Sequence, residues 1–316
     1  MAASLDTVLE GLRAAAEPTR LRLLALCAEG ELTVSELVQI LGQSQPRVSR
    51  HLKLLCDAGL LARLPEGSWV FYRLAEGGGR ANGLVRQIAD LIPHGDVQLE
   101  RDRERLAAVR AARAARAAAY FRANAEDWDR IRALHVDDGE VEKRLLALLP
   151  PQAIAGELLD IGTGTGHVLE VYGKRGVKGV GVDLSLDMLR VARANLAKAG
   201  LADAHVRQAD MYRLPFEAGA FAAIVFHQVL HFADDPAAAI AEAARVLAPG
   251  GRLIAVDFAP HALDELRARH NHRRLGFADS EMRAWLGAAG LAPAAPLALP
   301  GKQLTVCLWA ADRPNA

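Results

Sequence analysis

Asp160-Ile161-Gly162-Thr163-Gly164-Thr165-Gly166 is the stretch that decides the fold of the second half of this 316-residue chain. It follows the apolar pair Leu158-Leu159 and precedes a helical pattern, so it connects a buried strand to a helix. Glycines at alternate positions let the backbone approach a ligand closely, with the N-terminus of the following helix facing that ligand. The stretch therefore predicts a site for a nucleotide-like cofactor.

The residues around this stretch indicate an α/β domain with a second domain ahead of it. After Gly156, short apolar runs alternate with helical patterns, which is typical of βαβ units and a parallel sheet. Because the residues ahead of the stretch exceed what this fold needs, we expect a separate domain over residues 1–92, a helical linker or dimerisation segment over 93–119, and the cofactor domain over 120–316. Residues 97–149 are expected to be almost continuous helix, ended by two prolines. Strands are expected near residues 157–161, 178–183, 204–208, 221–227, 251–257 and 303–310.

Composition and charge exclude several classes of protein. The 38 basic and 38 acidic residues balance, and residues 1–90 contain ten of each, so any contact with nucleic acid must come from local clusters of charge. No apolar stretch approaches the roughly 18 residues of a membrane span, and residues 1–12 lack a signal-peptide pattern. We therefore expect a cytoplasmic protein with no membrane partner. The scattered cysteines Cys27, Cys56 and Cys307 argue against a disulfide framework or a cysteine-built metal site.

The front domain contains two helical patterns joined by a tight turn. Residues 33–41 form the first, with Thr33 expected as its N-cap, and residues 45–58 form the second. Val48, Leu52 and Leu55 make the buried stripe of the second helix, which leaves polar side chains on its free face to read base edges or hold phosphates. Residues 60–63 and 69–74 alternate as two strands around the turn residues 65–68, a hairpin suited to be a wing.

Three strings in this region, residues 17–24, 30–37 and 44–52, resemble the ArsR/SmtB family of winged-helix regulators. The resemblance implies a winged helix-turn-helix, mostly α with a β-hairpin wing, in a homodimer that binds a palindromic operator DNA and represses transcription. The residues expected to contact DNA bases or phosphates are Ser44, Gln45, Arg47, Ser49, Arg50, His51, Arg63 and Arg73.

One departure from that family concerns metal sensing. Metal-sensing members carry two cysteines where this chain has Thr33 and Ser35. Hydroxyls are poor ligands for soft metals or arsenite, and His94 and His135 are too isolated to suggest another site. No metal is therefore expected to bind.

The glycine-rich stretch favours one cofactor class over another. A dinucleotide site needs G-x-G-x-x-G, but the last position of that pattern is His167 here, whereas G-x-G-x-G fits, so nicotinamide is disfavoured. Asp183 ends the next apolar run, where a carboxylate can accept both ribose hydroxyls, and Asp210 ends the following strand, where it can accept from an adenine amino group. Taken singly, Asp183 also fits a helix cap and Asp210 a turn.

Four strings, residues 158–166, 183–189, 210–216 and 245–251, together resemble the class I S-adenosylmethionine-dependent methyltransferases over about residues 120–312. The resemblance implies a Rossmann-like seven-stranded sheet whose last strand, near residues 304–310, is antiparallel. It also implies S-adenosylmethionine (SAM) as the cofactor. The residues expected to bind it are Asp160, Gly162, Thr163, Gly164, Gly166, Asp183, Leu184, Met188, Asp210, Met211 and His227.

Methyl transfer depends chiefly on aligning the nucleophile, the methyl group and the sulfur, and a base is needed only if the acceptor must lose a proton. His227, His231 and His272 are the candidate bases, because a histidine titrates near neutral pH. Each also fits a simple packing or surface role. Residues 120–122 and 126–129 resemble the lid segment of small-molecule methyltransferases. Methylation of arsenic is not expected, since the domain has only Cys307.

The sequence leaves three functions open. In the first, the chain is a DNA-binding regulator whose second domain methylates a small molecule. In the second, that domain only senses SAM or S-adenosylhomocysteine (SAH) and so controls operator binding. In the third, which Gln45, Arg47 and Arg50 disfavour, the front domain only dimerises an enzyme.

Overall fold

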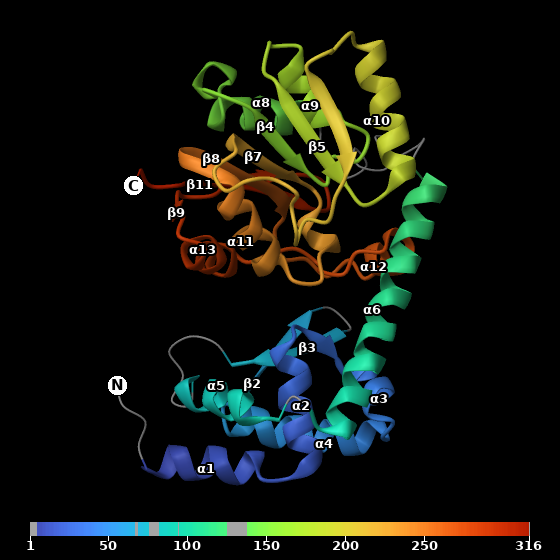
Figure 1. Ribbon diagram of the computed structural model, residues 1–316, viewed down its shortest axis with the longest axis vertical. Coiled ribbons are helices and arrows are strands. Elements are labelled where there is room, and N and C mark those ends of the chain that lie inside the picture. The colour runs from blue at the N-terminus through green and yellow to red at the C-terminus, as the bar shows by residue number, and fades with distance from the viewer. Residues whose placement is uncertain (1–4, 67–68, 76–81, 94, 125–137, 316) are drawn as a thin grey trace. The chain divides into compact units, whose positions relative to one another are not determined.

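The computed structural model of the chain describes residues 5–66, 69–75, 82–93, 95–124 and 138–315. It divides into two compact units, residues 1–116 and 117–316, each with its own core (Figure 1). No helix among the described residues is long and apolar enough to cross a membrane.

The first unit is mostly helical. Its strands form a three-stranded antiparallel sheet in the order β1-β3-β2. Its elements are α1 (Leu5–Ala15), α2 (Pro18–Ala28), β1 (Leu32–Thr33), α3 (Val34–Leu41), α4 (Gln45–Asp57), β2 (Leu61–Glu66), β3 (Trp69–Leu74), α5 (Asn82–Leu91) and the first part of α6 (Val97–Asn124).

Local sequence signals set the ends of these helices. Glu17 caps α2 by accepting from the backbone N–H of Arg20 at 2.9 Å, and Pro18 occupies the first helical position. Thr33 caps α3, as expected, and Glu36 completes a capping box by accepting from the Thr33 backbone N–H at 2.8 Å. Gly42 ends α3 in the left-handed conformation, with φ +64°. Short-range signals therefore set the starts of α2 and α3, and Gly42 sets the end of α3.

The helix α6 belongs to the core of the first unit through its first half. Leu99, Leu106 and Val109 are buried together with residues of the preceding helices and strands. Residues 97–109 of the segment expected to be a linker thus pack against the front domain. Of the continuous helix expected over residues 97–149, α6 and α8 (Asp138–Leu148) are present, and residues 125–137 lie outside the described residues.

The second unit is an α/β sandwich. Its strands are β4 (Leu158–Ile161), β5 (Gly179–Asp183), β6 (Ala204–Gln208), β7 (Phe221–His227), β8 (Leu247–Phe258), β9 (Ala292–Pro293), β10 (Leu297–Pro300) and β11 (Thr305–Asp312). Its helices after α8 are η2 (Pro151–Ala153), α9 (His167–Gly173), α10 (Leu186–Lys198), η3 (Leu230–Phe232), α11 (Pro236–Val246), α12 (Glu265–His270) and α13 (Asp279–Ala288).

The sheet has the mixed topology that the methyltransferase resemblance implies. Seven strands follow one another in the order β10-β11-β8-β7-β4-β5-β6, and β9 pairs with β11 off this path. The central pairs are parallel, whereas β11 is antiparallel to β8 and β10. Six strands were expected from the residues themselves, and β9 and β10 were not among them. β10 is a four-residue edge strand that ends in Pro300, with alternate residues exposed, so its apolar signal is weak.

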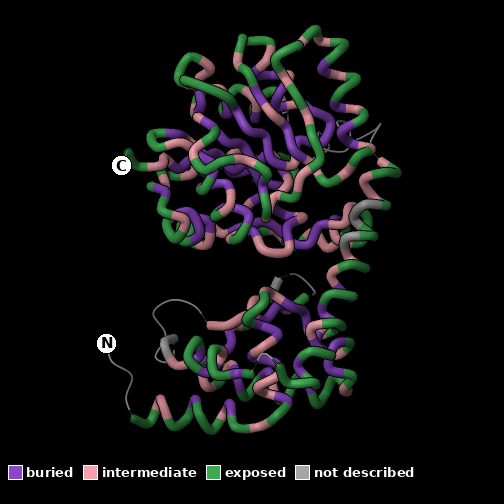
Figure 2. The backbone as a smooth tube through the Cα atoms, viewed as in Figure 1, coloured by how far each residue is buried: buried purple, intermediate pink, exposed green. Residues whose placement is uncertain are grey.

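Helices cover both faces of this sheet because its strands alternate buried side chains between two cores. In β8, Leu253 and Ala255 belong to one core with α11 and α13, while Ile254 and Val256 belong to the other with α8 and α9. The buried strands run through the middle of the unit in Figure 2. This arrangement leaves the carboxyl ends of the parallel strands at one edge, where ligands of open α/β sheets bind.

Candidate DNA interface and cofactor site

The helix α4 presents a polar face to solvent. Val48, Leu52 and Leu55 are completely buried, as the sequence predicts, so the opposite face is free to contact a ligand. Ser44 stands at the N-cap without making a side-chain cap bond among the described residues. The exposed expected DNA contacts in and beside α4 are Ser44, Gln45, Arg47, Ser49 and Arg50.

The other expected DNA contacts lie elsewhere in the first unit. The side chain of His51 is largely buried, and its Nδ1 lies 3.6 Å from Oε2 of Glu17, at the start of α2. Arg63 is exposed on β2, whereas Arg73 on β3 forms an ion pair with Glu31 at 3.5 Å. The structure thus brings the α4 residues together and gives His51 and Arg73 partners within the domain. The wing turn, residues 67–68, lies outside the described residues.

Thr33 and Ser35, which stand where metal-sensing relatives have cysteines, serve the start of α3. The Thr33 hydroxyl accepts from the Glu36 backbone N–H at 3.3 Å and lies 3.0 Å from Ser35 Oγ. In the part of the chain that the structure describes, no group of three or more His, Cys, Asp or Glu residues could hold a metal. The isolated His94 and His135 lie outside it.

The glycine-rich stretch forms a tight loop after β4. Gly162, Gly164 and Gly166 all have positive φ values of +72°, +53° and +84°. A Cβ on Gly162 would lie 2.2 Å from Cγ2 of Val229, which follows β7, so a larger residue does not fit there. Asp160 is buried at the end of β4 and accepts from the Thr163 hydroxyl at 2.6 Å. The glycines are therefore required by the backbone conformation of the loop and, at Gly162, by its packing against Val229.

Asp183 connects this loop to the next strand. Its Oδ2 accepts from the Gly164 backbone N–H at 3.0 Å, and its Oδ1 accepts from the Ser185 backbone N–H at 2.8 Å. Burial raises the pKa of Asp183, although hydrogen bonds from the backbone of Ser185, Gly164 and Leu184 lower it in part. Each carboxylate oxygen has a second lone pair, so Asp183 can still accept hydroxyl groups.

The remaining expected cofactor residues follow β5 and β6. Met188 is buried in α10, and the Ser185 hydroxyl caps this helix by accepting from the Met188 backbone N–H at 3.3 Å. Leu184 is 58% exposed, which is unusual for a leucine beside a strand end. Asp210 is exposed and accepts from the Tyr212 backbone N–H at 3.0 Å, and Met211 is half-buried. The Asp210 carboxylate thus stabilises the turn after β6, the structural role that the sequence also allows.

The candidate bases divide into two groups. His231 and His272 are buried and stack with their ring centroids 4.0 Å apart. His231 Nδ1 donates to Asp257 Oδ1 at 2.8 Å, and the same fully buried carboxylate accepts from the backbone N–H of His231 and of Phe258. His227, at the end of β7, is half-buried, and its ring centroid lies 6.2 Å from that of His167.

Part of the expected lid contacts η3 and the end of α12. Phe121 meets Phe232 edge to face at 5.0 Å, and Tyr120 shares a 2.8 Å hydrogen bond with Nδ1 of His270. Burial raises the pKa of Tyr120 to about 12 and lowers the pKa of His270, so both groups are neutral near pH 7. Residues 126–129, the other part of the expected lid, lie outside the described residues.

Comparison with known proteins relates each of the two units to a family. Residues 17–63 match the family described as bacterial regulatory protein, arsR family, and residues 159–255 match the family described as methyltransferase domain. The chain joins an ArsR-family DNA-binding domain to a class I methyltransferase domain. The order of the sheet strands agrees with the second assignment.

Individual relatives resemble one domain each. The ArsR-family domain is 51% identical to the arsenical resistance operon repressor of Escherichia coli (strain K12) over 61 residues, 19% of this chain and 52% of that protein. The methyltransferase domain is 36% identical to the ubiquinone/menaquinone biosynthesis C-methyltransferase UbiE of Desulfotalea psychrophila (strain LSv54 / DSM 12343) over 110 residues, 34% of this chain and 44% of that protein. The chain spans about half the length of the curated relatives that it matches.

A solved structure supports the fold of the methyltransferase domain. Geranyl diphosphate methyltransferase, in complex with GPP and sinefungin, superposes with a TM-score of 0.50 and 22% identity. The match covers 55% of this chain and 77% of that chain. At this identity the likeness shows the fold alone.

The sequence reasoning missed two polar partners in the methyltransferase domain. Asp257 holds His231, and Glu142 on α8 lies 2.9 Å from Nε2 of His167. A signal for Asp257 was present, because it follows the apolar run 253–256 as Asp160 and Asp183 follow theirs. No spacing in the sequence relates Glu142 to His167, since they lie on different elements.

Proposed function

We propose that this chain is a transcriptional repressor that binds a palindromic operator DNA as a homodimer. The observation that supports it most directly is the exposed face of α4, which carries Gln45, Arg47 and Arg50, while the apolar stripe of the same helix is completely buried. A helix of this kind can enter the major groove, with arginine and glutamine side chains reading base edges and phosphates.

The surface of α1 supports the homodimer. Leu5, Leu9 and Leu12 lie one turn apart on one face and are 74%, 38% and 46% exposed. A stripe of three leucines at this spacing is costly to leave in water, and a second copy of the same helix would bury it.

SAM is the cofactor that we propose for the methyltransferase domain. The loop after β4 supports it, because Gly162 and Gly164 give the loop its tight left-handed turns, and the carboxylate of Asp183 lies beside them, bonded to the Gly164 backbone N–H. Asp160, Asp183 and Asp210 would hold the cofactor, with Leu184 and Met188 beside the β5 end. When bound, SAM supplies an electrophilic methyl group.

For the reaction, we propose methyl transfer to a small-molecule acceptor. The buried pair of His231 and Asp257 supports a base at this site, since a carboxylate on Nδ1 orients the imidazole and stabilises its protonated form. His272 stacks on His231 and would modulate it, while His227, at the end of β7, has its ring centroid 6.2 Å from that of His167, the residue after the cofactor loop.

A second candidate function is sensing of SAM or SAH without turnover. It is favoured by the burial of His231, which is 2% exposed beneath the His272 ring and so has little access to an acceptor. In this case the ligand would shift operator binding by binding the two conformations of the protein unequally.

One experiment tests both halves of the proposal. Operator duplexes are selected from random DNA with the 316-residue chain, and their affinity is measured while SAM or SAH is titrated in. We expect Arg47→Ala to weaken binding by at least tenfold, which would support the α4 contact, and a ligand to change the wild-type affinity.

The outcomes are distinguishable. Binding by Arg47→Ala as tight as that of the wild type contradicts the α4 contact. An affinity that neither SAM nor SAH changes removes the sensor, and labelled methyl from SAM that passes to no component of a cell extract removes the enzyme.

A further inference from the structure

The helix α6 carries a polar face that contacts the helix-turn-helix. Asp102, Arg105, Arg110 and Arg113 lie on the side of α6 that also buries Leu106 and Val109 in the core of the ArsR-family domain. We call these four residues the α6 polar face. None of them was singled out by the DNA-binding motif, and none lies on α3 or α4.

Two arginines of the α6 polar face bind the carboxyl ends of other helices. Arg105 Nη1 donates to the Ile40 carbonyl at 2.9 Å, near the end of α3, and Arg110 Nη2 donates to the carbonyl of Glu29, the C-cap of α2, at 2.5 Å. Both helices lie wholly within the described residues and have no basic residue in their own last turns. The helix α6 therefore supplies the cations that these two carboxyl ends favour.

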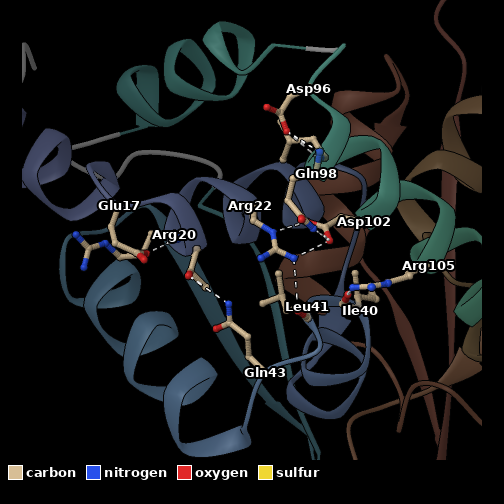
Figure 3. A network of polar contacts seen from close by, with 12 residues as sticks. Glu17, Arg20, Arg22, Ile40, Leu41, Gln43, Asp96, Gln98, Asp102 and Arg105 are labelled. Atoms are coloured by element: carbon tan, nitrogen blue, oxygen red, sulfur yellow. Dashed lines mark hydrogen bonds and ion pairs between the residues drawn. The ribbon is translucent and has the colours of Figure 1, made fainter.

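Asp102 binds the end of α3 through a second arginine. It is 1% exposed and accepts from Nε and Nη2 of Arg22, on α2, at 2.5 and 2.7 Å, and from Gln98 at 3.2 Å. The same Nη2 of Arg22 donates to the Leu41 carbonyl at 3.5 Å (Figure 3). Asp102 thus fixes an arginine whose other contact is the last residue of α3.

Both contacts fall at the turn that orients α4. Leu41 is followed by Gly42, and α4 begins three residues after Gly42, at Gln45. Arg105 reaches this turn, since its Nη1 lies 3.7 Å from the position that a Cβ on Gly42 would take. Arg113 adds an ion pair of 3.0 Å to Glu36, at the start of α3. The helix α3 is therefore tied to α6 at two carbonyls of its last turn, one of them through Arg22, and at one side chain of its first turn.

We propose that Asp102 and Arg105 are positioning residues for DNA recognition, which hold the end of α3 so that α4 has the orientation needed to bind operator DNA. The inference rests on the operator binding proposed above. It makes α6 the element through which that affinity can be regulated, because a displacement of α6 would move the turn.

The test compares variants of the full chain on the selected operator duplex at several salt concentrations. Arg105→Met removes the donor at an exposed residue, Arg105→Lys keeps a cation, and Arg101→Met, an exposed arginine on the same helix, is the matched control. We expect Arg105→Met to lose about tenfold in affinity, Arg105→Lys to recover most of it and Arg101→Met to stay within about twofold. Far-UV circular dichroism and thermal unfolding verify that each variant is folded at the temperature of the assay.

The salt dependence distinguishes positioning from direct contact. Loss of a phosphate contact lowers the slope of log affinity against log salt by about one, whereas loss of positioning leaves the slope unchanged. Asp102→Asn is a second variant for the same measurement, since an aspartate cannot contact phosphate and any loss in the folded variant must be indirect.

Three results overturn the inference. The first is a folded Arg105→Met protein that binds the operator as tightly as the wild type. The second is a salt slope that falls by one in Arg105→Met while the operator affinity of Asp102→Asn is unchanged. A wild-type protein that selects no operator refutes the proposed function as well, which separates the two failures.

Discussion

At the scale of single residues, Gly162 sets the shape of the cofactor loop. It needs a positive φ of +72°, and a Cβ there would overlap Val229. Gly176 has a similar φ of +80°, but among the described residues nothing lies within 4 Å of its Cβ position. A side chain at either position would strain the backbone, but only at Gly162 would it also overlap a neighbouring side chain.

We expect Gly162→Ala to destabilise the methyltransferase domain by roughly 2–4 kcal/mol and to abolish SAM binding, because strain and overlap add. Gly176→Ala should cost only about 1 kcal/mol, from backbone strain alone. Chemical denaturation and calorimetric SAM titration measure both effects. Equal destabilisation by the two substitutions would contradict the role of Val229.

The carboxyl group of Asp183 should make SAM binding depend on pH. Its raised pKa means that the carboxyl group takes up a proton at a higher pH than the 3.8 of an ordinary aspartate. Protonation removes the negative acceptor, so SAM affinity should fall as the pH is lowered, and the fall should begin above pH 3.8. In the absence of ligand the sign is opposite: because the pKa is higher in the folded state, protonation of Asp183 stabilises the fold as the pH falls.

Calorimetric titration with SAM between pH 8 and the acid limit of stability checks this expectation. Asp183→Asn should bind SAM more weakly and lose this part of the pH dependence. The same pH profile in the wild type and the variant would show that another group titrates.

At the scale of elements, the helix α1 is expected to carry the contact between two copies of the chain. Leu9 is the middle residue of its exposed leucine stripe. Leu9→Asp should turn the proposed dimer into monomers and reduce operator affinity, since a charge would be buried in the proposed interface and the proposed palindrome needs two copies.

Sedimentation velocity and operator titration measure this effect. Glu10→Gln, next to Leu9 and also exposed, is the control and should leave both unchanged. A Leu9→Asp protein that sediments as the wild type does would place any dimer contact elsewhere.

Elements also show how far the sequence could be interpreted. The capping box at Thr33, the buried stripe Val48, Leu52 and Leu55, and the glycine loop were predictable because each depends on residues close in the chain. The strands β9 and β10 were missed because short edge strands carry little hydrophobic signal. Asp257 was missed as the partner of His231, since 26 residues separate them.

At the scale of the whole molecule, the chain combines a DNA-binding domain with a domain of the methyltransferase fold. The single helix α6 contributes to both units, with Leu106 in the core of the first and Tyr120 bonded to His270 in the second. A regulator with this organisation can link a metabolite to transcription only if ligand binding changes the helix-turn-helix. The α6 polar face offers the first unit a place where such a change would act.

The sequence by itself determined the two domains, the loop from Asp160 to Gly166 and the exposed face of α4, because helix caps, glycine conformations and hydrophobic periodicity are local properties. Only the tertiary structure decided that His231 is buried against Asp257, that His51 faces Glu17, and that Asp102 and Arg105 hold the end of α3. These contacts join residues distant in sequence, and the free energy that favours them comes from burial and charge pairing in the folded chain.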